Sequence, residues 1–251
     1  NDFEKITVLT RGYKGKKKGP LIVKKYNTFQ EVGEESILHS KFGLTCVSKN
    51  KFEGALMCKK IGSKLIIMDD GLQSINVKKD FNILVIDGTF KFGNNNLIPA
   101  GPLREPVEEC LKKCNAILII GKKKIIKELK EIPREKIFWA EKKIKTHNIK
   151  NKRVFAFSAL GNNKNFHNCL IKSGMKILEK KTFLDHHIFS KNELINIVNK
   201  AEEKKLTIVC TEKDYIKVPN EFKKKIFPID LELKILEERK LKFKILQELL
   251  N

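Results

Sequence analysis

Leu65-Ile66-Ile67-Met68-Asp69-Asp70-Gly71 is the part of the 251-residue chain that indicates its architecture most directly. The first four residues are all apolar, so an extended segment would be apolar on both faces, which is typical of a buried strand in a parallel sheet. The apolar run stops at two carboxylates and a glycine. Because ligands of parallel α/β sheets bind at the carboxyl ends of strands, we expect Asp69 and Asp70 to lie at a binding edge.

Short apolar runs of this kind recur along the chain and alternate with segments that we expect to be helical. The expected strands are residues 6–9, 21–23, 45–47, 65–68, 81–86, 116–120, 154–157, 177–182 and 207–210. The expected helices are residues 34–40, 54–61, 107–113, 125–131, 165–173 and 191–200, with a final helix within 231–250. This alternation predicts parallel sheets in two α/β domains. Residues 132–152 are highly charged and show little apolar periodicity, so we expect domains at 1–140 and 141–251.

The chain carries a formal net charge of +22, with lysines spread along its whole length. Such a charge attracts polyanions, although solvated lysines that reflect compositional bias would give the same number. Nucleic-acid binders cluster their basic residues with aromatic ones, and this chain does not, so we expect no nucleic-acid partner. The six cysteines include no Cys-x-x-Cys pair, which indicates a reducing compartment. The sequence contains no stretch of 18 apolar residues, so we expect no membrane-spanning helix in this chain.

Four groups of polar residues at expected strand ends could carry chemistry. Asp69-Asp70 resembles the carboxylates that hold Mg²⁺ against nucleotide phosphates, although a turn with helix-capping carboxylates has the same sequence. Asp185-His186-His187 places a histidine beside an acid, as general acid–base catalysis requires, or forms an ordinary surface loop. Thr10–Gly15 is a basic, glycine-containing loop suited to an anionic substrate, and residues 94–106 form a loop rich in Gly, Asn and Pro around Arg104-Glu105. For these two loops a purely structural role stays open.

The residues of these groups and their order along the chain resemble those of the tetraacyldisaccharide 4′-kinase family of lipid A biosynthesis. The matching segments are LTRGYKG (9–15), VGEES (32–36), MDDGLQ (68–73), VIDGTFKFGNNNLIPAGPLREP (85–106), FSALG (157–161), FLDHH (183–187) and TEKD (211–214). They occur in family order across nearly the whole chain, and the DDGLQ and PAGPLREP segments are the most specific.

The resemblance implies a P-loop-kinase-like parallel-sheet domain with a smaller C-terminal α/β domain. It implies transfer of the γ-phosphate of ATP, with Mg²⁺, to the 4′-hydroxyl of the lipid A disaccharide precursor at the cytoplasmic face of the bacterial inner membrane. Asp69 and Asp70 match the metal-organising acids, while Glu34 and His186 match the catalytic acid–histidine pair. The positions that match substrate-binding residues are Arg11, Tyr13, Glu35, Lys51, Gln73, Arg104 and Glu105.

Several positions depart from the family pattern. Glu34 stands where the family usually has Asp, Lys51 where it often has Arg, and Ser74 where His is common. Nothing in the sequence matches the phosphate loop G-x-x-x-x-G-K-[ST]. We therefore expect an N-terminally truncated chain that lacks the first βα unit, and we assign no residue to an ATP phosphate loop. We expect this chain by itself neither to bind ATP tightly nor to phosphorylate the disaccharide.

Two other functions remain open on the sequence. The chain could be a noncatalytic basic protein that binds nucleic acid or an anionic membrane, which its charge would suit. It could also be a related P-loop enzyme that acts on another sugar lipid. The sequence predicts no protein partner, and it leaves acyl-chain preference and oligomeric state undetermined.

Overall fold

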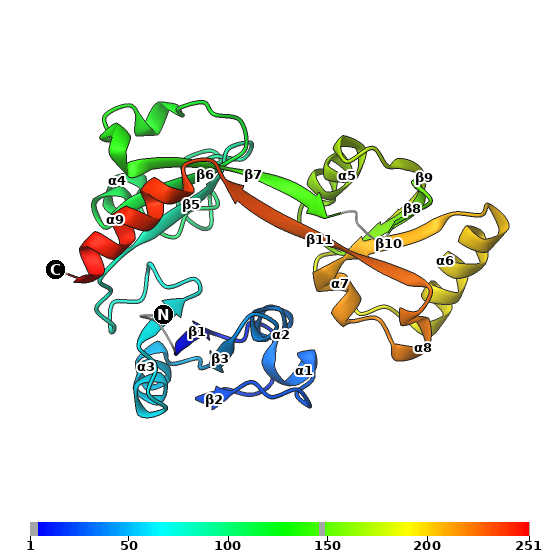
Figure 1. Ribbon diagram of the computed structural model, residues 1–251, viewed down its shortest axis with the longest axis horizontal. Coiled ribbons are helices and arrows are strands. Elements are labelled where there is room, and N and C mark those ends of the chain that lie inside the picture. The colour runs from blue at the N-terminus through cyan, green and yellow to red at the C-terminus, as the bar shows by residue number, and fades with distance from the viewer. Residues whose placement is uncertain (1–4, 146–148, 251) are drawn as a thin grey trace. The chain divides into compact units, whose positions relative to one another are not determined.

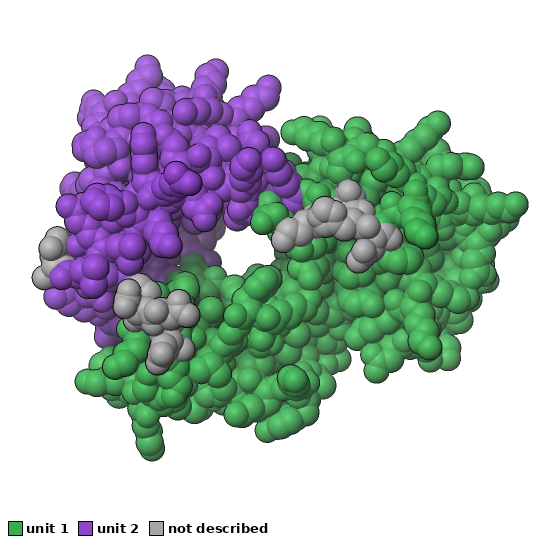
Figure 2. All heavy atoms as spheres, viewed as in Figure 1, with its two compact units in different colours: residues 1–70, 144–232 green, residues 71–143, 233–251 purple. Residues whose placement is uncertain are grey.

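The computed structural model describes residues 5–145 and 149–250. The chain forms two compact units (Figure 2). Unit 1 consists of Asn1–Asp70 and Ile144–Glu232, and unit 2 of Gly71–Lys143 and Leu233–Asn251. The expected division at residue 140 lies close to the step between Lys143 and Ile144, but each unit combines two separate segments. The division into two consecutive domains therefore stays a prediction.

The first sheet of unit 1 has the strand order β2-β3-β1-β4. Its strands are β1 (Ile6–Thr10), β2 (Leu21–Ile22), β3 (Leu44–Val47) and β4 (Leu65–Met68), and its helices are α1 (Phe29–Val32), α2 (Glu34–Ser40) and α3 (Lys51–Lys60). β1 runs parallel to both β3 and β4, while β2 is antiparallel to β3. Leu9, Cys46 and Cys58 form one buried cluster between this sheet and α3. The parallel strands bring the ends of β1 and β4 to the same edge.

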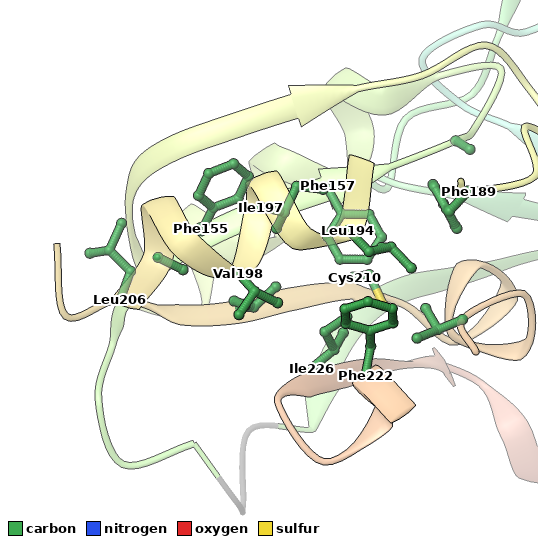
Figure 3. Close-up of a cluster of buried hydrophobic side chains, with 14 residues drawn as sticks. Phe155, Phe157, Phe189, Leu194, Ile197, Val198, Leu206, Cys210, Phe222 and Ile226 are labelled. Carbon is green, nitrogen blue, oxygen red and sulfur yellow. The ribbon is translucent and has the colours of Figure 1, made fainter. Parts of the chain in front are cut away.

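Unit 1 also contains a second parallel sheet, with the order β11-β10-β8-β9. Its elements are β8 (Arg153–Ser158), α5 (Asn163–Lys172), β9 (Lys176–Thr182), α6 (Lys191–Glu203), β10 (Thr207–Thr211), α7 (Glu212–Ile216), α8 (Asn220–Lys223) and β11 (Ile226–Ile235). Successive side chains of a strand point to opposite faces. Val154 and Ala156 accordingly pack with Phe166 of α5, whereas Phe155 and Phe157 pack with α6 (Figure 3). Helices therefore cover both faces, as a sheet apolar on both sides requires.

Unit 2 is built on the same principle around β5 (Ile83–Asp87), β6 (Ala116–Ile120) and β7 (Ile137–Lys145), which run parallel (Figure 1). Ile117 and Ile119 belong to the cluster that contains α4 (Val107–Lys112). Ala116 and Leu118 belong to the opposite cluster, which contains α9 (Glu238–Leu250). The predicted α/β class with parallel sheets is thus confirmed in both units.

Two strands were not predicted, and one expected helix is only a short turn. Residues 132–152 contain β7, whose Ile137 and Trp139 face one core and Phe138 the other, so four buried residues outweigh the surrounding charge. The final helix expected within 231–250 is α9, which begins at Glu238, but the strand β11 before it was not predicted. The expected helix at 125–131 is a single 3₁₀ turn, Lys127–Leu129. Ile126, just before this turn, and Leu129, its last residue, are both buried, and their spacing of three suits that tighter helix.

The remaining expected elements occur within a few residues of their predicted ends, including all the strands that precede the candidate site residues. Within the described residues, none of the helices combines the length and the apolar content needed to cross a bilayer.

Candidate functional site

Glu34 is placed by an unusual backbone at the start of α2. Gly33 precedes it with φ of 89°, a conformation that L side chains rarely adopt. A Cβ added at Gly33 would lie 2.6 Å from the carbonyl oxygen of Tyr13, so only glycine allows this approach. The glycine thereby lets the Thr10–Gly15 loop pack directly against the first turn of α2. Glu34 itself is buried, with 7% of its surface exposed.

His186 lies in the loop after β9, and it too has a left-handed backbone, with φ of 62°. Its N–H donates a hydrogen bond to the carbonyl oxygen of Ala159 at 3.3 Å. Its ring Nδ1 lies 3.1 Å from Oε2 of Glu34, and the two side chains are only 11% and 9% exposed. The structure therefore brings together two residues that the family resemblance had paired.

Tyr13 and Asp185 complete the surroundings of the His186 ring. The Tyr13 ring meets the imidazole edge-on, with 5.4 Å between ring centres. Nε2 of His186 lies 3.7 Å from Oδ2 of Asp185. If the Glu34 carboxylate accepts the Nδ1–H, the other ring nitrogen keeps its lone pair and can accept a proton. The adjacent His187 is engaged elsewhere, because its Nε2 lies 3.0 Å from Glu193.

Two lysines of the second sheet's α7 region also reach Glu34. Nζ of Lys213 lies 3.7 Å from Oε2 of Glu34 and 3.5 Å from Oε1 of Glu35. Nζ of Lys217 lies 3.6 Å from Oε1 of Glu34, and its side chain is fully buried. Both carboxylate oxygens of Glu34 therefore face positively charged or proton-donating groups.

Asp69 lies at the end of β4, beside the end of β1. Its Oδ2 accepts a hydrogen bond from Oγ1 of Thr10 at 2.9 Å and lies 3.6 Å from Nε2 of His39. The hydrogen bond with His39 lowers the pKa of Asp69 below its ordinary value, assisted by Thr10 and the charge of Lys51, against an opposing effect of burial. Asp69 is therefore a carboxylate at neutral pH, as a metal ligand must be.

Lys51 opens α3 and turns inward. Its Nζ donates to the carbonyl oxygens of Leu9 at 3.1 Å and Asp69 at 2.6 Å, which fixes the ends of β1 and β4 to each other. Burial lowers the pKa of Lys51, while the negative charges of Asp69 and Asp70 partly offset the effect. The expected substrate-binding lysine is thus engaged with backbone oxygens at the strand ends.

Asp70 follows Asp69 in a left-handed conformation with φ of 50° and is exposed. The described residues contain no group of three or more His, Cys, Asp or Glu side chains arranged to hold a metal ion. Protein sites for Mg²⁺ often supply only one or two carboxylates, with phosphate and water completing the shell. The two adjacent acids fit that requirement. Arg11, in the neighbouring loop, is exposed.

Gln73, Arg104 and Glu105 belong to unit 2. Nε2 of Gln73 donates to Oε1 of Glu105 at 2.9 Å, and Lys113 forms a short ion pair with Glu105. The ion pair with Lys113 is the main cause that lowers the pKa of Glu105. The PAGPLREP segment and the DDGLQ segment are therefore tied to each other by a side-chain hydrogen bond.

His39, Lys213 and Lys217 were not predicted as site residues from the sequence. His39 follows no strand and lies in the last turn of a helical segment, so nothing in its neighbourhood pointed to Asp69. A signal for Lys217 did exist, because Asp214 and Lys217 are three residues apart in the helical segment after β10, a spacing that places them on one face.

Comparisons with known proteins show which family the chain matches. The family described as tetraacyldisaccharide-1-P 4′-kinase (LpxK) matches residues 3–250. A tetraacyldisaccharide 4′-kinase of Paramagnetospirillum magneticum is 31% identical over 231 residues, which are 90% of this chain and 70% of the relative. One of Parvibaculum lavamentivorans is 34% identical over 216 residues, which are 84% of this chain and 63% of the relative.

Among solved structures, the chain is similar to the crystal structure of "apo" form LpxK from Aquifex aeolicus in complex with ATP. The TM-score is 0.75 at 26% sequence identity, covering 97% of this chain and 79% of the other. The chain spans about two thirds of the length of the curated relatives that it matches, from 63% to 70% for these two.

Proposed function

Because the chain belongs to the tetraacyldisaccharide-1-P 4′-kinase family, we propose that it takes part in transfer of the γ-phosphoryl group of ATP to the 4′-hydroxyl of a tetraacyldisaccharide 1-phosphate. The structural observation that supports this proposal is the 3.1 Å contact between Nδ1 of His186 and Oε2 of Glu34. A shielded acid–histidine pair is what activation of a sugar hydroxyl needs. The family match disfavours the alternative of a noncatalytic basic protein.

In the proposed reaction His186 is the general base. Glu34 accepts the Nδ1–H, which leaves the Nε2 lone pair free to take the proton of the 4′-hydroxyl. The Glu34 carboxylate then stabilises the positive charge that develops on the ring. General-base catalysis of this kind contributes roughly 10²- to 10⁴-fold. The low exposure of both side chains strengthens their interaction, because water screens it little.

Asp69 and Asp70 would hold Mg²⁺ at the ends of the first sheet. A bound Mg²⁺ neutralises charge on the phosphates during phosphoryl transfer. The lowered pKa of Asp69 supports this assignment because the carboxylate needs no deprotonation step before it binds a cation. Lys51 would keep the two strand ends together and so hold Asp69 in place.

Arg11, Tyr13, Glu35, Gln73, Arg104 and Glu105 are the proposed substrate-binding residues. Exposed Arg11 and Tyr13 lie in the loop next to the Glu34–His186 pair, where the reacting sugar would bind. Arginine suits this task because its guanidinium contacts phosphate through two parallel hydrogen bonds. The assignments of Gln73, Arg104 and Glu105 rest on the family motifs and on their mutual hydrogen bonding in unit 2.

We place the reaction at the cytoplasmic face of the bacterial inner membrane, where the family's acylated substrate resides. The net charge of +22 supports this location, since anionic lipid head groups attract a basic protein. No residue is assigned to an ATP phosphate loop, and low turnover by the 251-residue chain alone stays a prediction.

The proposal is tested by following transfer of ³²P from γ-labelled ATP to tetraacyldisaccharide 1-phosphate. The assay uses the 251-residue chain and, in parallel, the protein expressed from its complete coding region. A 4′-deoxy disaccharide is the control that lacks the acceptor. Transfer to the 4′-hydroxyl supports the proposal. Absence of transfer by both proteins, or a clear preference for another sugar lipid in a substrate panel, would overturn it.

A further inference from the structure

The geometry points to Lys217 as a positioning residue that sets the orientation of the Glu34 carboxylate toward His186, an inference that rests on the proposed kinase function. Lys217 would act through Glu34 and would not touch the substrate. The family motifs quoted above end at Asp214, three residues before it.

Lys217 is a buried cation between two carboxylates. Its Nζ lies 3.0 Å from Oδ1 of Asp214 and 3.6 Å from Oε1 of Glu34, and the side chains of Lys217 and Asp214 are both fully buried. The ammonium also lies 5.2 Å from the centre of the Phe189 ring. Within the described residues, neither Nζ of Lys217 nor Oδ1 of Asp214 makes a hydrogen bond of normal geometry. An ammonium with three donors is therefore only partly satisfied by Asp214, and Glu34 is its second anionic partner.

Asp214 holds Lys217 in place and is itself fixed. Its Oδ2 accepts hydrogen bonds from Oγ1 of Thr211 at 2.7 Å and from the N–H of Ala159 at 3.1 Å. The carbonyl oxygen of the same Ala159 accepts the N–H of His186. The backbone of one residue thus links Asp214 to His186, while Lys217 links Asp214 to Glu34. These contacts join both members of the catalytic pair to one buried ion pair.

The two oxygens of Glu34 have different partners. Oε1 faces Lys217, whereas Oε2 faces both His186 at 3.1 Å and Lys213 at 3.7 Å. With Lys217 present, Oε1 is occupied and Oε2 remains directed at the imidazole. Without Lys217, Lys213 would be the ammonium left beside Glu34 among residues 5–145 and 149–250, and it contacts the same oxygen as His186 and is 20% exposed. Glu34 would then turn toward Lys213, and His186 would lose the acceptor of its Nδ1–H.

A purely structural role for Lys217, as a packing link between α2 and α7, would predict a loss of stability alone. A positioning role predicts that, in protein that remains folded, the substitution changes which ring nitrogen of His186 carries the proton. Long-range ¹⁵N–¹H correlation spectra of the unliganded chain report this tautomer, and a His186→Gln variant assigns the signal.

The experiment compares Lys217→Met, Lys217→Arg and the double variant Asp214→Asn/Lys217→Met. The double variant removes both buried charges, so it guards against misfolding caused by an uncompensated Asp214. We expect the Nδ1–H form of His186 to predominate in the parent chain and to lose that predominance in both Met variants. Lys217→Arg should restore it at least in part. Lys225→Met is the matched control, because Lys225 pairs with Glu202 at an exposed site.

In the protein expressed from its complete coding region, Lys217→Met should lower kcat by roughly 10- to 100-fold with a much smaller change in KM, as a misplaced catalytic group does. A changed tautomer in a protein without kinase turnover would contradict the proposed function and leave the positioning role supported. Folded Met variants that keep the parental tautomer and the parental kcat would overturn the role of Lys217.

Discussion

Nδ1 of His186 lies 3.1 Å from Oε2 of Glu34, although 152 positions of sequence separate the two residues. One comes from the first turn of α2 and the other from the loop after β9. Gly33, directly before Glu34, has φ of 89°, which glycine adopts readily, whereas His186 has a φ of 62° that L side chains rarely adopt. Residues held in sparsely populated conformations often lie at functional sites, where the surrounding structure compensates for their strain.

Replacing His186 with Ala should lower kcat by roughly 10²- to 10⁴-fold, because the proposed general base is lost. The free energy of unfolding should change much less, because Glu34 keeps its ion pairs with Lys213 and Lys217 when the ring is removed. Steady-state kinetics and urea denaturation measure the two effects. His187→Gln is the matched control, as His187 contacts Glu193 and should leave kcat nearly unchanged. Unaltered turnover in His186→Ala would remove His186 from the mechanism.

Two substitutions at Glu34 test separately the charge and the length of the acidic side chain. Glu34→Gln keeps the size but cannot stabilise a protonated imidazole, so kcat should fall. Glu34→Asp restores the residue usual in the family but shortens the side chain by one bond, about 1.5 Å. Because Glu34 already reaches His186 at 3.1 Å, we expect Glu34→Asp to lower kcat as well, by less than Glu34→Gln. A faster Glu34→Asp enzyme would show that the longer acid is a poor fit.

Gly33→Ala should destabilise unit 1 by about 1–3 kcal/mol. The added Cβ would lie 2.6 Å from the carbonyl oxygen of Tyr13, and the backbone at φ of 89° disfavours any L side chain. Urea denaturation followed by circular dichroism measures the change. Gly43→Ala is the control, because a Cβ there meets no atom within 4 Å. Equal stability of the two variants would contradict the close approach between the Thr10–Gly15 loop and α2.

The stability of the protein should decrease in acid partly through Glu193. Hydrogen bonds from His187, and then from Ser190, lower the pKa of Glu193 from 4.5 to about 2. Since the folded-state pKa lies below the unfolded one, this contribution is complete above pH 4.5 and is lost as the pH falls toward 2. The difference in unfolding free energy between the parent and Glu193→Gln should therefore shrink between pH 6 and pH 2. A difference that stays constant over this range would contradict the assigned partners.

Local sequence predicted the strands and helices that are defined by a short apolar run or by residues a few positions apart. The apolar run before Gly121 forms β6, which is buried as a segment apolar on both faces should be. The four apolar residues before Asp69 form the parallel strand β4, but the expected burial was wrong, because β4 ends the strand order of its sheet and Ile67 stays 49% exposed. Ser190 and Glu193 form the capping box that starts α6, which depends only on residues three apart. Such features need no knowledge of the rest of the chain.

β7 and β11 could not be predicted in this way. The apolar half of β7 is followed by the charged run Glu141-Lys142-Lys143, and β11 continues into residues with helical character. Whether such segments extend as strands depends on the neighbouring strands available to accept their backbone hydrogen bonds. In β11 this partner is β10, which pairs with it from Ile226 onward.

The sequence by itself determined the α/β class, the strand ends that carry Asp69 and Asp70, and the family motifs that contain Glu34 and His186. These properties follow from short-range apolar patterns and from residue identity. Only the tertiary structure decided that Lys217 lies against Glu34, that His39 contacts Asp69, and that Lys51 joins two strand ends through backbone carbonyls. Buried charges have no local sequence pattern, because the groups that compensate them come from distant elements brought together by folding.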